Sequence, residues 1–293
     1  MKNRQIRTGF SWTKAAPYIF VAPAVIYIIC LTMIPAIMAL PISFTNWSAL
    51  SPNKKFVGLD NYVKLFGDKD FWRSCLVMAK FFIYIPIVMA TGLGAALLVN
   101  SKSRGTQIFR VVFYAPVITS TVAVAILFDW FYQPTFGLFN AILKWFGLPA
   151  IGWLTDPDTA VGSVILFKVW KDFGTAMLIY LAGLQDIGGE IVEAAMVDGA
   201  GVRQRFIHIT FPLLKPSHTY LLLTNIIGVF MIFQETYVLE GTLNSTRTVV
   251  NYIYEQGFQS FRIGYASAMS FLLFVFIIII TVIQQKASKL ELA

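Results

Sequence analysis

Charged residues, histidines and cysteines are scarce in this sequence. Only 13% of the 293 residues are charged, whereas a soluble globular domain usually carries about 25%. The two cysteines, Cys30 and Cys75, show no metal-ligand or redox spacing, and we interpret them as packing residues. No His-Glu-x-x-His pattern occurs either, so the composition argues against a soluble domain, a zinc protease and a thiol redox centre.

A phosphate-binding loop is also missing. The pattern Gly-x4-Gly-Lys-[Ser/Thr] is absent, and no Gly-Lys pair occurs anywhere in the chain. Such a loop holds nucleotide phosphates through its backbone N–H groups and its lysine. If the protein depends on ATP, another subunit must therefore bind the nucleotide.

Long apolar runs dominate what is present. Hydrophobic residues make up 57% of the chain, and the mean hydropathy is +0.69. Several runs exceed the roughly 20 residues that a helix needs to cross a bilayer. We therefore predict an all-α polytopic membrane protein with a single domain over residues 1–293. We predict six spans, which cover residues 16–40, 74–99, 107–131, 159–184, 216–239 and 264–283.

The first apolar run is interpreted as an uncleaved span. It extends from Tyr18 to Leu40, whereas the apolar core of a signal peptide has only about 7–15 residues.

The basic residues predict how the chain is oriented in the membrane. The net charge of +8 does not indicate nucleic-acid binding, because Lys and Arg lie in short loops beside apolar runs, where they bias orientation. With the N-terminus inside, twelve lie in inner segments: Lys2, Arg4, Arg7, Lys14, Lys102, Arg104, Arg110, Arg203, Arg205, Lys215, Lys286 and Lys289. Eight lie in outer segments: Lys54, Lys55, Lys64, Lys69, Arg73, Lys144, Arg247 and Arg262. The excess inside predicts that both termini are cytoplasmic.

A polar stretch, Glu193–Pro212, separates the fourth and fifth predicted spans. Glu190 and Glu193 are expected in the first turn of a helix, where acidic side chains complement the helix dipole. Ala194 and Ala195 give this helix a smooth face that another protein can approach closely. Gly199 predicts a turn, and a second short helix follows. An ordinary amphipathic connector explains these features equally well.

The spacing within this stretch resembles that of a known family. The pattern Glu-Ala-Ala-x3-Gly-x9-Ile-x-Phe-Pro resembles the EAA loop of bacterial ABC importer permeases, the inner-membrane components of binding-protein-dependent transport systems. The family pattern has Leu where this chain has Phe211. Further segments resemble the carbohydrate-uptake branch, especially its maltose-permease-F-like subunit. They are FVGLDNYVKLF at 56–66, FRVVFYAPVITSTVAVAILF at 109–128, GLFNAIL at 137–143, LAGLQDI at 181–187 and GYASAMS at 264–270.

This resemblance implies a type I ABC importer permease fold in the plasma membrane of a bacterium. It implies that residues 186–215 form a cytoplasmic coupling loop that docks on a dimeric ATPase. The residues expected to make this contact are Glu193, Ala194, Ala195, Asp198, Gly199, Ile209 and Pro212.

The resemblance also implies a division of labour among subunits. ATP and Mg²⁺ would be bound by the partner ATPase and no cofactor by this chain, which would be a transporter subunit and not an enzyme. A second permease subunit would complete the translocation pathway, and an extracytoplasmic solute-binding protein would deliver a sugar or related polyol. Closure of the ATPase would then drive alternating access.

Polar residues within the spans are candidates for the substrate pathway, because they are costly in lipid and usually face a cavity or a partner. Aromatic residues are added because sugars stack on them. The candidates are Trp170, Asn225, Phe230, Gln234, Glu235 and Tyr237, with Lys168, Lys171 and Asp172 as further polar positions. The competing interpretation for each is a helix–helix hydrogen bond or an interface anchor. Lys168 and Asp172, four residues apart, are also expected to neutralise each other.

Two other classes of protein compete with the importer interpretation. An ion-driven secondary transporter would need a relay of intramembrane ionisable residues and often has internal repeats. A membrane-embedded enzyme would need an acidic or histidine cluster at one interface. The acidic pairs Asp156/Asp158 and Asp68/Asp70 have no accompanying histidine, and we interpret His208 and His218 as solvated residues at the membrane edge.

Overall fold

The computed structural model describes residues 12–51, 54–101 and 105–292, which are almost entirely helical. Among these residues the one extended pairing is an isolated bridge between Thr45 and Phe56. The chain forms two compact units. One consists of the chain up to Gly67 together with Gln256–Leu272, and the other of Asp68–Glu255 together with the chain from Leu273 onward.

The first unit contains the N-terminal apolar helices and the beginning of the last helix. α1 (Trp12–Ile28), a π-helical turn (Ile29–Met33) and α2 (Ile34–Ser43) follow one another, and α3 (Asp60–Gly67) packs beside them. The Asn61 amide fastens α3, because it donates to the carbonyls of Ser43 and Thr45 at 2.8 Å each. Gly264 lies against the Thr45 carbonyl so closely that a Cβ would overlap it.

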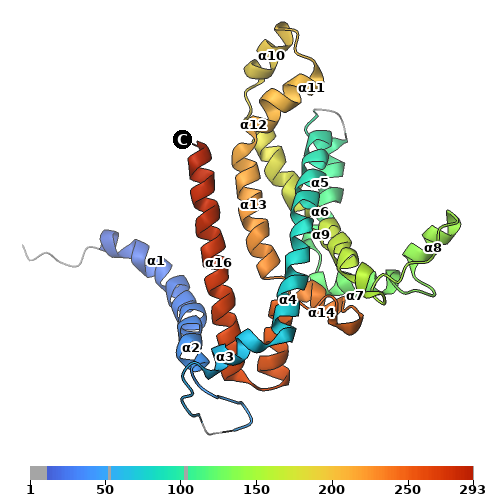
Figure 1. Ribbon diagram of the computed structural model, residues 1–293. Coiled ribbons are helices and arrows are strands. Elements are labelled where there is room, and N and C mark those ends of the chain that lie inside the picture. The colour runs from blue at the N-terminus through green and yellow to red at the C-terminus, as the bar shows by residue number, and fades with distance from the viewer. Residues whose placement is uncertain (1–11, 52–53, 102–104, 293) are drawn as a thin grey trace, which may run out of the picture. The chain divides into compact units, whose positions relative to one another are not determined.

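The second unit is built around α9 (Pro157–Asp186), which packs against α5, α6 and α13. Figure 1 shows α9 and α13 leading into the α10–α12 segment at the same end. The preceding elements are α4 (Lys69–Lys80), η2 (Phe81–Ile83), α5 (Tyr84–Val99), α6 (Thr106–Ile118), α7 (Thr121–Phe131) and α8 (Leu138–Trp145). The following ones are α10 (Gly189–Val197), α11 (Val202–Arg205), η3 (Phe206–Thr210), α12 (Phe211–Leu213), α13 (Lys215–Phe230), α14 (Gln234–Val238), η4 (Thr242–Asn244), α15 (Val249–Tyr254) and the end of α16 (Ile263–Leu292). Of η5 (Glu255–Gln259) only Glu255 belongs to this unit, and its other residues belong to the first.

Within the described ranges, four helical stretches are long and apolar enough to cross a membrane, or five if one bent pair forms a single span. The four are Ala16–Ser43, Lys69–Val99, Lys215–Val238 and Ile263–Lys286. They overlap the predicted first, second, fifth and sixth spans. α9 covers the predicted fourth span but is less apolar, because Lys168, Lys171 and Asp172 lie in its middle.

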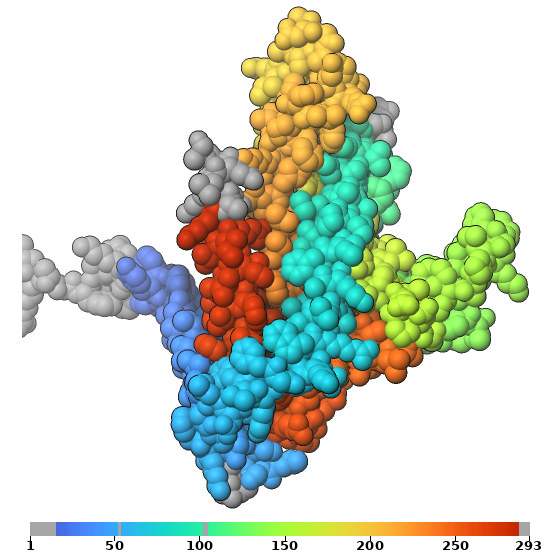
Figure 2. Space-filling model, in the orientation of Figure 1, coloured from blue at the N-terminus to red at the C-terminus, as the bar shows by residue number. Residues whose placement is uncertain are grey.

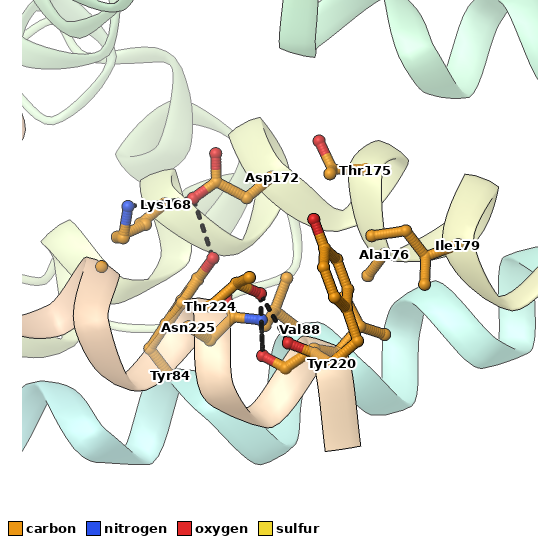
Figure 3. Close-up of a pocket in the computed structure, with 12 residues that line it drawn as sticks. Tyr84, Val88, Lys168, Asp172, Thr175, Ala176, Ile179, Tyr220, Thr224 and Asn225 are labelled. Carbon is orange, nitrogen blue, oxygen red and sulfur yellow. Dashed lines mark hydrogen bonds and ion pairs between the residues drawn. The ribbon is translucent and has the colours of Figure 1, made fainter. Parts of the chain in front are cut away.

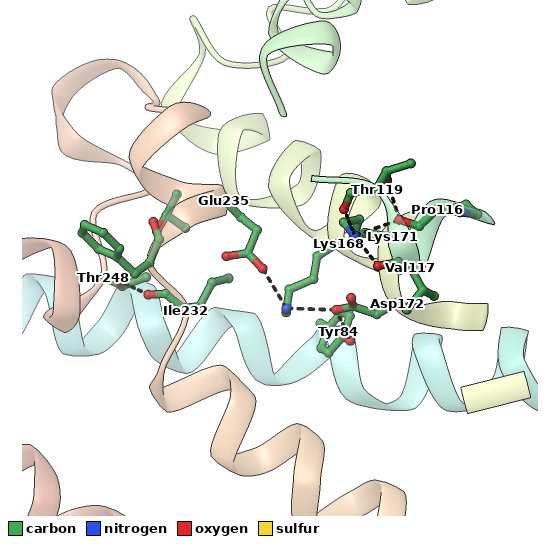
Figure 4. Close-up of polar contacts among 12 residues, drawn as sticks. Tyr84, Pro116, Val117, Thr119, Lys168, Lys171, Asp172, Ile232, Glu235 and Thr248 are labelled. Carbon is green, nitrogen blue, oxygen red and sulfur yellow. Dashed lines mark hydrogen bonds and ion pairs between the residues drawn. The ribbon is translucent and has the colours of Figure 1, made fainter. Parts of the chain in front are cut away.

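The predicted third span, residues 107–131, forms two helices bent by 94°. α6 ends at Ile118, Thr119 is extended, and the Ser120 hydroxyl accepts the Ala123 N–H at the start of α7. The last carbonyls of a helix lack partners within that helix. Here the buried Lys171 ammonium binds three carbonyls at the bend (Figure 4). Its Nζ lies 2.7 Å from the Pro116 oxygen, 3.0 Å from that of Val117 and 2.9 Å from that of Thr119.

The orientation count is only partly covered by the structure. Lys2, Arg4, Arg7, Lys102 and Arg104 lie outside the described residues, as do the side chains of Lys14 and Lys289. The cytoplasmic position of the termini therefore stays a prediction.

Candidate functional site

The polar stretch between α9 and α13 forms a helical hairpin, defined here as residues 186–215. α10 ends at Val197, Gly199 turns the chain with a φ of +80°, and α11 begins at Val202. A left-handed φ is strained for residues with a Cβ, which accounts for glycine at this turn. The helix, turn and second helix expected from the sequence are therefore present. Because α10 (Gly189–Val197) begins before Glu190, Glu190 lies in its first turn, and the expectation that Glu193 also lies there is wrong.

Most residues expected to contact an ATPase lie on the surface of this hairpin. Glu193, Ala194, Asp198, Gly199 and Pro212 are exposed. Ala195 is buried and Ile209 is half-buried, so these two side chains also pack against other residues of the hairpin. In Figure 2 the hairpin presents an uncovered surface on the viewed side. These five residues are thus accessible on the surface, and their contact with an ATPase stays a prediction.

His218 lies at the base of the hairpin, where it is half-buried and hydrogen-bonded, so the prediction of a solvated edge residue holds only in part. Its Nδ1 lies 2.7 Å from the Tyr180 hydroxyl, and its Nε2 lies 3.2 Å from the Phe211 carbonyl oxygen. His208, in contrast, is exposed and bonds at 3.1 Å only to the Gln204 carbonyl of its own segment. Both histidines lie near Pro212 in the sequence, and nothing in the sequence distinguishes the half-buried His218 from the exposed His208.

A cavity of about 270 Å³ lies between α5, α9 and α13 (Figure 3). Its walls carry hydroxyl, amide and charged groups together with aliphatic surface. The polar residues are Tyr84, Lys168, Asp172, Thr175, Tyr220, Thr224 and Asn225. This mixture suits a small polar ligand that forms several hydrogen bonds.

Three charged side chains meet at one end of this cavity (Figure 4). Lys168 Nζ lies 2.9 Å from Asp172 Oδ2 and 3.0 Å from Glu235 Oε1. The Tyr84 hydroxyl donates to the same Asp172 oxygen at 2.8 Å. The expected pairing of Lys168 with Asp172 is confirmed. Glu235, on α14, adds a second carboxylate from another part of the chain, and this ionic cluster joins α9 to α14.

The predicted pathway residues are only partly brought together. Asn225 lines the cavity and donates to the Leu221 carbonyl at 2.7 Å, which leaves its amide oxygen without a partner among the described residues. Glu235 reaches the cavity through Lys168. Gln234 is exposed and lies outside the cavity lining.

The three aromatic candidates pack elsewhere. Trp170 packs against Phe128 with centroids 5.1 Å apart, and Phe230 is buried against Phe82 at 5.6 Å. Tyr237 contacts Phe233 at 5.4 Å. All three make ring contacts within this chain, which is neither the hydrogen bond nor the interface anchor of the competing interpretation, and their pathway role stays a prediction.

The sequence reasoning missed Tyr84, Thr175, Tyr220 and Thr224 as cavity residues. A usable signal existed, because residues three and four apart lie on one helix face. Lys168, Asp172 and Thr175 follow this spacing on α9. Scanning for polar residues on one face of an apolar helix would have selected them together.

A second polar cluster lies where α4 begins. Arg247 bonds Asp70 at 2.9 Å and Glu255 at 3.1 Å, and the Tyr252 hydroxyl donates to Asp68 at 2.7 Å. Burial and the Asp68 carboxylate raise the pKa of Tyr252 well above its usual range, so it stays a donor. Burial also raises the pKa of Glu255, against the opposing effect of Arg247. We interpret this cluster as structural, because it ties the 247–255 segment to the start of α4.

Several apolar helices of bilayer length and a polar cavity define a helical membrane protein that could bind a polar ligand, and similarity to known proteins identifies its family. The model for the family of binding-protein-dependent transport system inner membrane components matches residues 85–289. The chain belongs to this family.

Similar proteins agree over nearly the whole length. The chain is 36% identical to the probable ABC transporter permease protein YesP of Bacillus subtilis, over 98% of this chain and 94% of that protein. It is 33% identical to the trehalose/maltose transport system permease protein MalF of Thermococcus litoralis, over 88% of this chain and 90% of that protein.

A solved structure shows the same fold. A bacterial ABC transporter involved in import of the acidic polysaccharide alginate superposes with a TM-score of 0.83 and 25% identity, covering 95% of this chain and 98% of that one. The resemblance noted in the sequence is therefore confirmed. The chain is an ABC transporter permease subunit with the type I permease fold, and not an enzyme.

Proposed function

We propose that this chain forms part of the translocation pathway of an ATP-driven importer for a sugar, an oligosaccharide or a related polyol. The observation that carries the proposal is the cavity between α5, α9 and α13, lined by hydroxyl and amide groups, in a chain of the permease family. Sugars bind proteins through many hydrogen bonds, and Thr175, Tyr220, Thr224 and Asn225 supply both donors and acceptors. The relatives named for trehalose, maltose and alginate support this substrate class.

We propose six spans with both termini in the cytoplasm. The six are the four apolar stretches, α9, and the bent α6–α7 pair counted as one span. α9 has 30 residues, which at 1.5 Å per residue exceeds the roughly 30 Å thickness of the hydrocarbon core. Its central charges are each compensated, Lys168 by two carboxylates and Lys171 by three carbonyls, which lowers their cost in the membrane. We place the whole chain, residues 1–293, in one permease domain.

The hairpin is the proposed coupling element. Its exposed residues Glu193, Asp198 and Gly199 would dock on a dimeric cytoplasmic ATPase that binds ATP and Mg²⁺. A solute-binding protein on the opposite side fits the family, whose members work in binding-protein-dependent systems. A second permease subunit would face this one across the pathway. Each ATP cycle would then shift the populations of inward-open and outward-open states. We assign the complex to the bacterial plasma membrane, because the family consists of inner membrane components.

Substitutions in the hairpin test the coupling role. Glu193→Lys reverses an exposed charge, and Gly199→Asp forces a side chain into a left-handed turn. Both are expected to reduce co-purification of the ATPase and ATP-driven uptake at least tenfold while the chain still inserts. The matched control is Gly188→Asp, at a glycine with open space and a negative φ in the same hairpin. Normal ATPase binding and uptake in both variants would refute the coupling role.

A further inference from the structure

We propose that Tyr180, His218 and Phe211 form a joint that transmits movement of the hairpin to the walls of the cavity. This inference rests on the proposed function, since it assigns residues to the coupling step. The three residues belong to α9, α13 and α12 respectively. We call them the hairpin joint.

The hairpin joint connects three helices through one imidazole ring. The Phe211 carbonyl can only accept, so His218 Nε2 is the donor at 3.2 Å. In the neutral ring Nδ1 then accepts from the Tyr180 hydroxyl at 2.7 Å. The ring also packs on Phe211, with centroids 4.5 Å apart, and edge-on to Tyr180 at 5.1 Å. A displacement of Phe211 therefore acts on α9 and α13 together.

Side chains at the start of α13 also pack closely against Gly183 of α9. A Cβ at Gly183 would overlap the Ser217 hydroxyl oxygen and lie 2.9 Å from Leu214 Cδ2. Leu214 is fully buried. The end of α9 and the start of α13 are thus in direct contact on either side of the hairpin, and close-packed contacts transmit displacement rather than absorb it.

The hairpin joint lies next to the cavity along both helices. Ile179 lines the cavity and precedes Tyr180, and Tyr220 lines it two residues after His218. Thr175 lies about one and a half helical turns from Tyr180 on α9. Rotation or tilt at the joint would consequently move cavity-lining side chains directly. Phe211 stands where the family pattern has Leu, and a Leu side chain has no ring to stack on the imidazole.

Accessibility of the cavity tests this inference without knowledge of the transported sugar. The assembled importer, with Cys30→Ser, Cys75→Ser and Thr175→Cys in this chain, is treated with a charged methanethiosulfonate reagent. Modification of residue 175 is timed without nucleotide and after trapping with ATP and vanadate. Trapped nucleotide is counted in every sample, so that only trapped complexes are compared. When the hairpin joint is unaltered, the rate of modification at residue 175 should differ several-fold between the nucleotide-free and the trapped complex.

Tyr180→Phe and His218→Ala should each remove most of this difference, because the cavity no longer follows the hairpin. His218→Gln, whose amide can both accept and donate, should restore part of it. The matched control is Tyr132→Phe. It removes another buried hydroxyl bond to α9, the 2.6 Å bond to the Ser163 carbonyl near the other end of that helix, and should keep the full difference.

The outcomes separate the two proposals. If the rate at residue 175 does not respond to nucleotide even with the joint intact, the proposed function fails, because the cavity is not coupled to ATP. If it responds and both joint variants respond equally, the function stands and the hairpin joint is refuted. A merely structural role would slow or speed modification in both states alike and leave the ratio unchanged, which also refutes the joint.

Discussion

Lys168 is the residue on which the electrostatics of the cavity depend. Its side chain is 11% exposed, and it is bound by Asp172 and Glu235, whose side chains are 33% and 14% exposed. Because the ammonium binds two carboxylates, the free energy of each charged group depends on the presence of the other two. Replacing an entire buried ionic group with apolar residues is often harmless, whereas removing one partner leaves an uncompensated charge.

We therefore expect Lys168→Met to destabilise the protein by roughly 2–4 kcal/mol, somewhat less than a fully buried pair would give, because Asp172 is one-third exposed. Thermal unfolding of the purified subunit measures the change. The control is Glu235→Gln, which leaves the pair of Lys168 and Asp172 intact and should cost clearly less. Equal unfolding temperatures for Lys168→Met and the unmodified protein would show that the cluster does not stabilise the fold.

At the scale of helices, we expect the close contact between α5 and α9 to contribute to the stability of the folded subunit. A Cβ at Gly92 would overlap that of Ala176 and lie 3.0 Å from the Ala176 carbonyl carbon. Small residues at such contacts allow membrane helices to approach closely. Gly94, two residues along the same helix, has open space on the side where a Cβ would point, with no neighbouring atom within 4 Å of it.

These two glycines provide a matched pair of substitutions. Gly92→Ala should lower the unfolding temperature and the yield of folded subunit, because α5 and α9 must separate, at a cost of roughly 1–3 kcal/mol. Gly94→Ala should be neutral or slightly stabilising, since alanine favours a helix by about 1 kcal/mol over glycine. Loss of stability in Gly94→Ala equal to that in Gly92→Ala would contradict this explanation.

The apolar spans could be predicted from the sequence because an apolar run of bilayer length needs no knowledge of its neighbours. The bend between α6 and α7 could not. It depends on Lys171, which supplies donors to the Pro116 carbonyl from 55 positions away. The break between α13 and α14 has a similar origin, because Thr248 donates to the Ile232 carbonyl at 2.9 Å.

The candidate site was predicted unevenly for a related reason. The hairpin motif is local, so its helices and its Gly199 turn follow from adjacent residues. The cavity is assembled from three helices, and the chemistry of a side chain does not say which neighbour its helix face meets. Of the predicted pathway residues, Asn225 lines the cavity, whereas Trp170 and Phe230 pack against Phe128 and Phe82, and contact with a substrate stays a prediction.

At the scale of the whole molecule, we propose that one permease subunit combines a docking hairpin, the hairpin joint and a polar cavity. The rival at this scale is an ion-driven transporter that uses the ionic cluster as a relay. The cluster gives little support to that rival, because Lys168 is already bonded to both carboxylates. The two mechanisms differ in their source of energy, and that difference can be measured.

The most direct test is uptake into proteoliposomes that contain the complete importer, with the solute-binding protein on the side opposite the ATPase. Radiolabelled maltose, trehalose and a panel of neutral oligosaccharides serve as probes. We predict that at least one accumulates only when ATP is present on the ATPase side, that a proton ionophore has little effect, and that Gly199→Asp abolishes accumulation. Accumulation driven by an ion gradient without ATP would contradict the account.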